Sequence, residues 1–124
     1  MPVLSAAAAE VHEMHGSRFT SYARPATGST QLCAWRLDVA PGTTGVPHRP
    51  SREEVLAILG GAASVTLDGE VHSATAGDVV LVPAGAEFRL DVLGDEPLRA
   101  WVTTTTGLSA TLADGSTITP PWAS

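Results

Sequence analysis

Short apolar runs separated by turn-forming residues are the most constraining feature of this sequence. Glycine, proline and aspartate recur at close intervals along the 124 residues, and the runs between them are rich in Val, Leu and Thr. Such runs favour β-strands, and short strands at regular spacing are typical of an all-β sandwich or barrel. The pattern predicts an all-β fold, with strands near 17–24, 30–39, 53–59, 62–67, 70–75, 78–82, 86–93, 97–105 and 108–118.

The two ends of the chain differ from this pattern. Residues 5–14 include four consecutive alanines, which favour a short helix. No linker or repeat divides the chain, so residues 1–124 are expected to form one domain with its barrel at about 30–105. An N-terminal strand segment and the C-terminal tail are expected to pack on that barrel.

A hairpin at Asp68-Gly69 is the most specific local prediction, because a two-residue Asp-Gly loop suits a type I′ turn. The turn sets the register of its flanking strands, in which the following residues face each other: Leu67 and Glu70, Val65 and His72, Ala63 and Ala74. This set is more apolar than the alternate set, so it is predicted to face the core. His72 is therefore expected to point inward.

Two other strands carry informative patterns. Residues 86–93 alternate, which places Phe88, Leu90 and Val92 on one inward face. Residues 55–59 are apolar without alternation, as in a strand that is covered on both faces. Either the N-terminal segment or a partner chain is expected to supply the second cover.

Composition and charge exclude several classes of function. The net charge of −6, with seven arginines and no lysine, leaves no basic patch for phosphates, so no nucleic acid partner is expected. Cys33 is the single cysteine and is interpreted as a buried apolar residue rather than a nucleophile. The N-terminus lacks a signal-peptide pattern, and no run of eighteen apolar residues occurs. A cytoplasmic protein without a membrane span is expected.

Two glycine-anchored segments carry the functional information. The first has the spacing G-x5-H-x-P-x3-E-x6-G from Gly42 to Gly61, and the second has G-x5-P-x-G-x2-F-x3-V from Gly77 to Val92. Together they resemble the paired motifs of the cupin superfamily, which read roughly G-x5-H-x-H-x3-4-E-x6-G and G-x5-P-x-G-x2-H-x3-N. The resemblance implies a cupin-type, RmlC-like jelly-roll β-barrel of two antiparallel sheets around a cavity, assembled as a homodimer.

The same resemblance implies a metal site, because the three histidines and the glutamate of the family motifs bind one divalent ion. His48 and Glu54 match two of these ligands, whereas Pro50 and Phe88 replace the second and third histidines. A divalent ion bound by protein alone usually takes three or four such ligands, so only weak binding of Fe, Mn, Ni or Zn is expected. The candidates to complete the site are His72, Glu53, and the pair His12 and His15.

Three functional hypotheses follow from these residues. We predict that the cavity binds a small organic molecule, with His48 and Glu54 at its polar end and Phe88, Leu56 and Leu90 as apolar lining. The alternative is a divalent-metal-dependent enzyme of dioxygenase, isomerase or polyketide-pathway type, with His48 and Glu54 as catalytic residues. A third is a ligand sensor or assembly partner. Two interpretations of His48 and Glu54 also stay open: a structural hydrogen-bonded pair, and an acid-base pair that works without metal.

Overall fold

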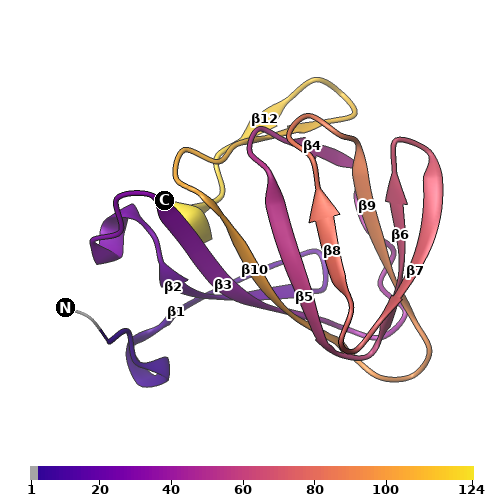
Figure 1. The fold of residues 1–124 in the computed structure, drawn as a ribbon, viewed down its shortest axis with the longest axis horizontal. Coiled ribbons are helices and arrows are strands. Elements are labelled where there is room, and N and C mark those ends of the chain that lie inside the picture. The colour runs from indigo at the N-terminus through magenta and orange to yellow at the C-terminus, as the bar shows by residue number, and fades with distance from the viewer. Residues whose placement is uncertain (1–2) are drawn as a thin grey trace.

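The computed structural model describes residues 3–124 as two six-stranded antiparallel sheets packed face to face (Figure 1). The first sheet contains, in spatial order, β1 (Glu10–Met14), β2 (Ser17–Ala23), β3 (Leu32–Val39), β10 (Leu98–Thr105), β5 (Glu54–Gly60) and β8 (Val79–Val82). The second contains β12 (Thr117–Ile118), β11 (Ala110–Leu112), β4 (His48–Pro50), β9 (Phe88–Leu93), β6 (Ala62–Leu67) and β7 (Glu70–Thr75). Three short 3-10 helices complete the chain: η1 (Ala6–Ala8), η2 (Pro25–Thr27) and η3 (Pro121–Ala123). The predicted all-β barrel of two antiparallel sheets is confirmed.

The Asp68-Gly69 hairpin forms as predicted. Asp68 and Gly69 have φ angles of 48° and 81°, which are the left-handed conformations that a type I′ turn requires. The register of β6 and β7 is the predicted one, with Val65 opposite His72 and Ala63 opposite Ala74. His72 lies on the predicted face, opposite Val65, but it does not reach the interior, because its side chain is 50% exposed and lies 3.7 Å from Glu70. β7 is the edge strand of its sheet, and Ala74 is its only buried residue.

The N-terminal segment is a strand rather than a helix for most of its length. Only Ala6–Ala8 form a single 3-10 turn, and β1 then pairs antiparallel with β2 from Glu10 opposite Ser21 to Met14 opposite Ser17. The two-residue turn between them is His15-Gly16, with φ angles of 51° and 79°. Pairing with an existing sheet edge outweighs the helix preference of the alanines, because that preference is weak in so short a segment.

The remaining differences from the predicted strands lie near prolines and glycines. The predicted strand 108–118 is two short strands, β11 and β12, which pair with each other around a turn that contains Gly115. β4 was not predicted, because Pro47 and Pro50 bound a three-residue strand that has no recognisable alternation. β4 nevertheless pairs with both β11 and β9, and the pairing places His48 directly opposite Phe88.

The outer face of the first sheet is uncovered in the described chain. On β5, Glu54, Leu56 and Ile58 are buried, whereas Val55 and Leu59 are 37% and 53% exposed. The expected N-terminal cover is absent, since β1 lies at the opposite edge of the sheet from β5 and β8. The strand is thus apolar on both faces although only one face is covered within residues 3–124.

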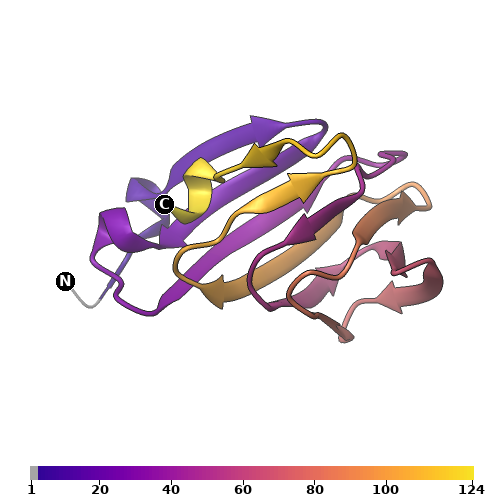
Figure 2. The same cartoon turned by 90° about the horizontal axis from the view of Figure 1, so that it is seen from above.

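Packing differs between the two ends of the sandwich. Around β6 and β8 the inner side chains fill the space between the sheets, with Ala63, Val65 and Val82 almost fully buried. At the other end the C-terminal segment lies alongside the hairpin of β1 and β2, and η3 contacts β1, β2 and β3 (Figure 2). There the sheets stand far enough apart to leave a cavity. Among residues 3–124 no helix is long and apolar enough to cross a membrane.

Candidate functional site

A cavity of about 280 Å³ lies between the two sheets. Its wall combines inward residues of the first sheet, including Trp35 and Leu56, with Phe88 and Leu90 of β9. Most of the wall is apolar, and its titratable side chains are His15, His48 and Glu54. The structure therefore places five of the six predicted site residues around one cavity: His48, Glu54, Phe88, Leu56 and Leu90. His72 is not among the lining residues.

His48 is held by the strand pairing and by its own backbone. Nδ1 donates a hydrogen bond to the carbonyl oxygen of Val46, 2.9 Å away, which leaves Nε2 as the acceptor of the neutral ring. The imidazole meets the Phe88 ring edge-on, with 5.4 Å between the ring centroids. The chain thus fixes both the position and the tautomer of this side chain.

Glu54 is a buried carboxyl group without a partner. It is 7% exposed, and its neighbours across the sheet are Thr104 and Val82. The Thr104 hydroxyl donates to the carbonyl oxygen of Glu53 instead, at 2.7 Å. Within residues 3–124 the Glu54 side chain makes no hydrogen bond or ion pair, including none with His48, so the hydrogen-bonded His48–Glu54 pair is not formed. Burial raises the pKa of Glu54 from 4.5 to about 7.

The donor set around the cavity does not fit a divalent metal ion. Pro50 is fully buried in the wall, and Phe88 places a ring where the family motif has a histidine, so neither position offers a ligand atom. No group of three or more His, Cys, Asp or Glu side chains within metal-binding reach occurs in the part of the chain that the structure describes. Two separated donors are fewer than such an ion usually takes from a protein.

The other residues considered for metal binding lie elsewhere. Glu53 is exposed, and His12 packs against Trp122 with its Nε2 3.3 Å from Glu10. His15 lies at the exposed turn between β1 and β2, where it borders the cavity. None of them is brought to His48 and Glu54 to complete a ligand set.

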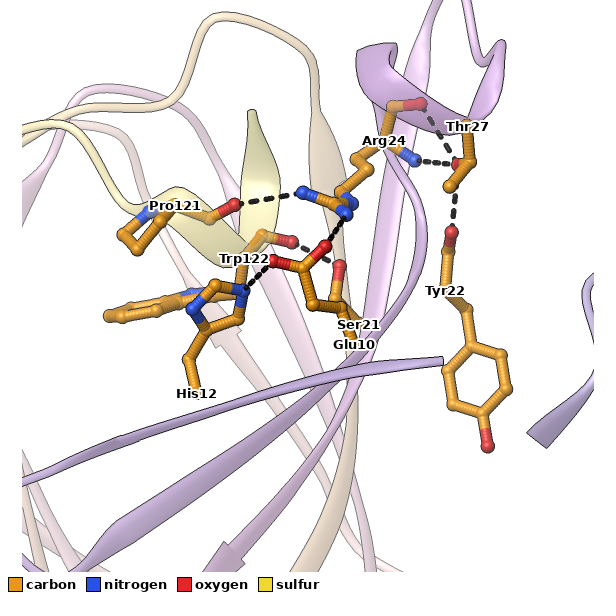
Figure 3. A network of polar contacts seen from close by, with 8 residues as sticks. All are labelled: Glu10, His12, Ser21, Tyr22, Arg24, Thr27, Pro121 and Trp122. Atoms are coloured by element: carbon orange, nitrogen blue, oxygen red, sulfur yellow. Dashed lines mark hydrogen bonds and ion pairs between the residues drawn. The ribbon is translucent and has the colours of Figure 1, made fainter. Parts of the chain in front are cut away.

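The C-terminal segment forms a wall of the cavity that sequence reasoning missed. The Trp122 indole stacks on Phe19 with 3.6 Å between ring centroids, and both rings line the cavity. Figure 3 shows how this segment is held: Ser21 Oγ donates to the Trp122 carbonyl at 2.6 Å, and Arg24 Nη1 donates to the Pro121 carbonyl at 3.2 Å. The only sequence signal was a tryptophan in a proline-containing tail, and it did not reveal the partner strand.

A second wall comes from the loop before β4. Thr43, Thr44, Gly45 and Val46 line the cavity, and the Gly45 amide donates to the Asp91 carboxylate at 2.8 Å. A Cβ atom on Gly45 would lie 2.3 Å from the Leu90 carbonyl oxygen, so only glycine permits this close approach. The loop is therefore pinned against β9.

The comparisons with known proteins agree with this architecture. Residues 35–104, more than half of the chain, match the cupin domain family, and the protein belongs to that family. A segment of 71 residues is 30% identical to a 1-hydroxy-2-naphthoate 1,2-dioxygenase from Nocardioides sp. strain KP7, covering 55% of this chain and 18% of the relative. This chain thus spans less than a fifth of the curated relative that it matches.

Solved structures show the same fold at low sequence identity. A polyketide cyclase from Streptomyces resistomycificus superposes with a TM-score of 0.74 at 14% identity, over 85% of this chain and 79% of the other. A sugar phosphate isomerase of the cupin superfamily from Silicibacter pomeroyi gives 0.73 at 20% identity, over 91% and 82%. These similarities establish the fold, while the site must be interpreted from this chain's own residues.

The Glu54 carboxyl gives stability a pH dependence with a defined sign. Between pH 4.5 and 7 the Glu54 side chain is ionised in the unfolded chain but stays protonated in the native protein. The free energy of unfolding therefore falls as pH rises through this range and levels off above pH 7. The difference between 7 and 4.5 corresponds to about 3 kcal/mol. Glu54→Gln has no carboxyl group at this position and should lack this pH dependence. Urea unfolding should therefore show the free energy of unfolding of the variant, relative to wild type, rising by about 3 kcal/mol from pH 4.5 to pH 8.

The exposed neighbour Glu53 provides the control. Glu53→Gln should follow the pH profile of the wild type. A stability difference between Glu54→Gln and wild type that stays constant over this pH range would contradict the assignment of the raised pKa.

Proposed function

We propose that this protein binds a small, largely apolar organic molecule in the cavity between its sheets. The observation that carries the proposal is the cavity itself: its wall is mostly apolar and includes two ionisable side chains, His48 and Glu54, that are not paired with each other. Ligand pockets commonly combine an apolar lining with a few convergent polar groups that orient the ligand. An unpartnered buried carboxyl is a group that a ligand can satisfy.

The volume limits the size of the ligand. A cavity of about 150 Å³ is sufficient for benzene, so about 280 Å³ suits a molecule of roughly two fused rings. The stacked pair of Phe19 and Trp122, together with Trp35 and Phe88, provides flat faces for such rings. The name of the Nocardioides relative specifies a fused two-ring substrate, which supports the same size class.

Ligand binding can be tested with 2-naphthol by isothermal titration calorimetry. The wild-type protein is expected to bind one molecule per chain. Leu90→Trp should fill the cavity and weaken binding by roughly tenfold or more, because Leu90 lines it. Leu93→Trp changes the same residue type on the same strand at an exposed position, so it should bind like the wild type. Equal affinities in all three proteins would show that 2-naphthol binds elsewhere.

We further propose that binding does not require a metal ion, since Pro50 and Phe88 occupy two ligand positions of the family motif. Wild-type protein incubated with Zn²⁺ or Ni²⁺ and then dialysed is expected to retain far less than one ion per chain by elemental analysis. The Pro50→His, Phe88→His double variant should retain about one ion per chain, provided that its circular dichroism is native-like. Near-stoichiometric metal in the wild type that His48→Ala removes would contradict this proposal.

We also propose that the outer face of the first sheet pairs with a second copy of this chain. Val55, Leu59, Val79 and Leu81 form an exposed apolar patch on β5 and β8, and patches of this kind mark association surfaces. In sedimentation velocity the wild type is expected to be a dimer. Leu81→Glu should shift it to monomer, whereas Val71→Glu, at an exposed valine of β7 on the other sheet, should not. A monomeric wild type would contradict the pairing.

A further inference from the structure

The cavity wall contains no permanent positive charge. The sequence has no lysine, and none of its seven arginines lines the cavity. Four of the arginines lie in ion pairs outside it: Arg24 with Glu10, Arg36 with Asp38, Arg49 with Asp68 and Glu87, and Arg89 with Asp91. A ligand carboxylate in this cavity would therefore have no guanidinium or ammonium group to pair with, which is the usual way that proteins bind such groups.

One polar group of the wall lacks a partner and suits a neutral ligand. The Glu54 carboxyl is 7% exposed and makes no hydrogen bond within residues 3–124. A hydroxyl group can donate a hydrogen bond to a carboxyl oxygen, and it can accept one from a protonated carboxyl group. A carboxylate can only accept.

The charge of Glu54 does not alter this preference. When ionised, Glu54 repels a ligand carboxylate in a region of low dielectric constant, and when protonated it offers a single hydrogen bond and no counter-charge. In either form the ligand carboxylate loses its hydration without full replacement. A neutral hydroxyl loses much less.

The surroundings of the cavity are also unfavourable to anions. An open hollow shares Met14, His15, Ser17 and Val39 with the cavity, and its charged residues are Glu13, Asp38 and Arg18. His15 is exposed at this hollow, where solvent screens any charge that it carries. The net charge of the chain is −6. Long-range attraction therefore does not offset the missing cation.

We infer that the cavity selects uncharged, hydroxylated apolar molecules of the phenol or naphthol class and rejects carboxylates of the same shape. The inference rests on the proposed small-molecule binding and specifies its ligand class. It follows from two observations: no arginine lines the wall, and the Glu54 carboxyl in the wall has no partner.

A matched pair of probes tests this selectivity: 2-naphthol and 2-naphthoate, titrated calorimetrically into the wild-type protein at pH 7. Naphthoate should bind roughly 100-fold more weakly than naphthol, because an unpaired charge costs more to bury than a neutral hydroxyl. Naphthoate binding within about threefold of naphthol would overturn the selectivity while leaving the proposed cavity binding intact. Binding of neither probe would overturn both.

A gain-of-function variant provides a second measurement. Leu90→Arg adds a guanidinium to the cavity wall and should strengthen naphthoate binding by roughly tenfold or more relative to wild type. Leu93→Arg adds the same charge on the same strand at an exposed position outside the cavity wall and should leave both affinities unchanged. Equal gains in both variants would assign the effect to net charge and overturn the inference. If Leu90→Arg fails to fold, the comparison of the two probes in the wild type still decides the question.

Discussion

Period-two alternation along strands of fixed register decides which side chains meet inside this protein. β10 pairs with β3 on one side and β5 on the other, so Val102 lies between Trp35 and Leu56 in a single inward row. In the row two residues away, Thr104 lies between Cys33 and Glu54. A shift of one residue in either pairing would turn Glu54 and Leu56 outward and Val55 inward, so the register places the carboxyl in the cavity.

Burial of the Glu54 carboxyl changes both its pKa and the interactions that it can make. Removal from water raises the pKa of the group to about 7, and no neighbouring cation or hydrogen bond of the described chain offsets this change. A carboxyl group that titrates near neutral pH can donate or accept a proton at ordinary pH, and it can also bind a hydroxyl group. The imidazole of His48, which also lines the cavity, already donates a hydrogen bond through Nδ1 to the Val46 carbonyl. The two polar groups are therefore available to a ligand separately.

The fold keeps the family architecture while its interior chemistry differs from the family motif. Pro50 and Phe88 lie in the cavity wall at positions where the motif has histidines, and both contribute apolar surface instead of ligand atoms. Two segments that are far apart in the sequence then complete the wall. Phe19 of β2 stacks on Trp122 of the tail, and hydrogen bonds from Ser21 and Arg24 to the tail carbonyls hold that contact in place. The resulting cavity is apolar over most of its surface.

The sequence by itself determined the strand composition, the Asp68-Gly69 hairpin with its register, the cupin fold, and the inward positions of His48, Glu54 and Phe88. These features depend on local turn chemistry, alternation and motif spacing, which are readable along the chain. Only the tertiary structure decided that Glu10–Met14 forms a strand, that His72 is exposed on an edge strand, and that Trp122 lines the cavity. It also decided that no arginine reaches the wall. These outcomes depend on which distant segments lie next to each other, and burial at a given position is set by those neighbours rather than by local sequence.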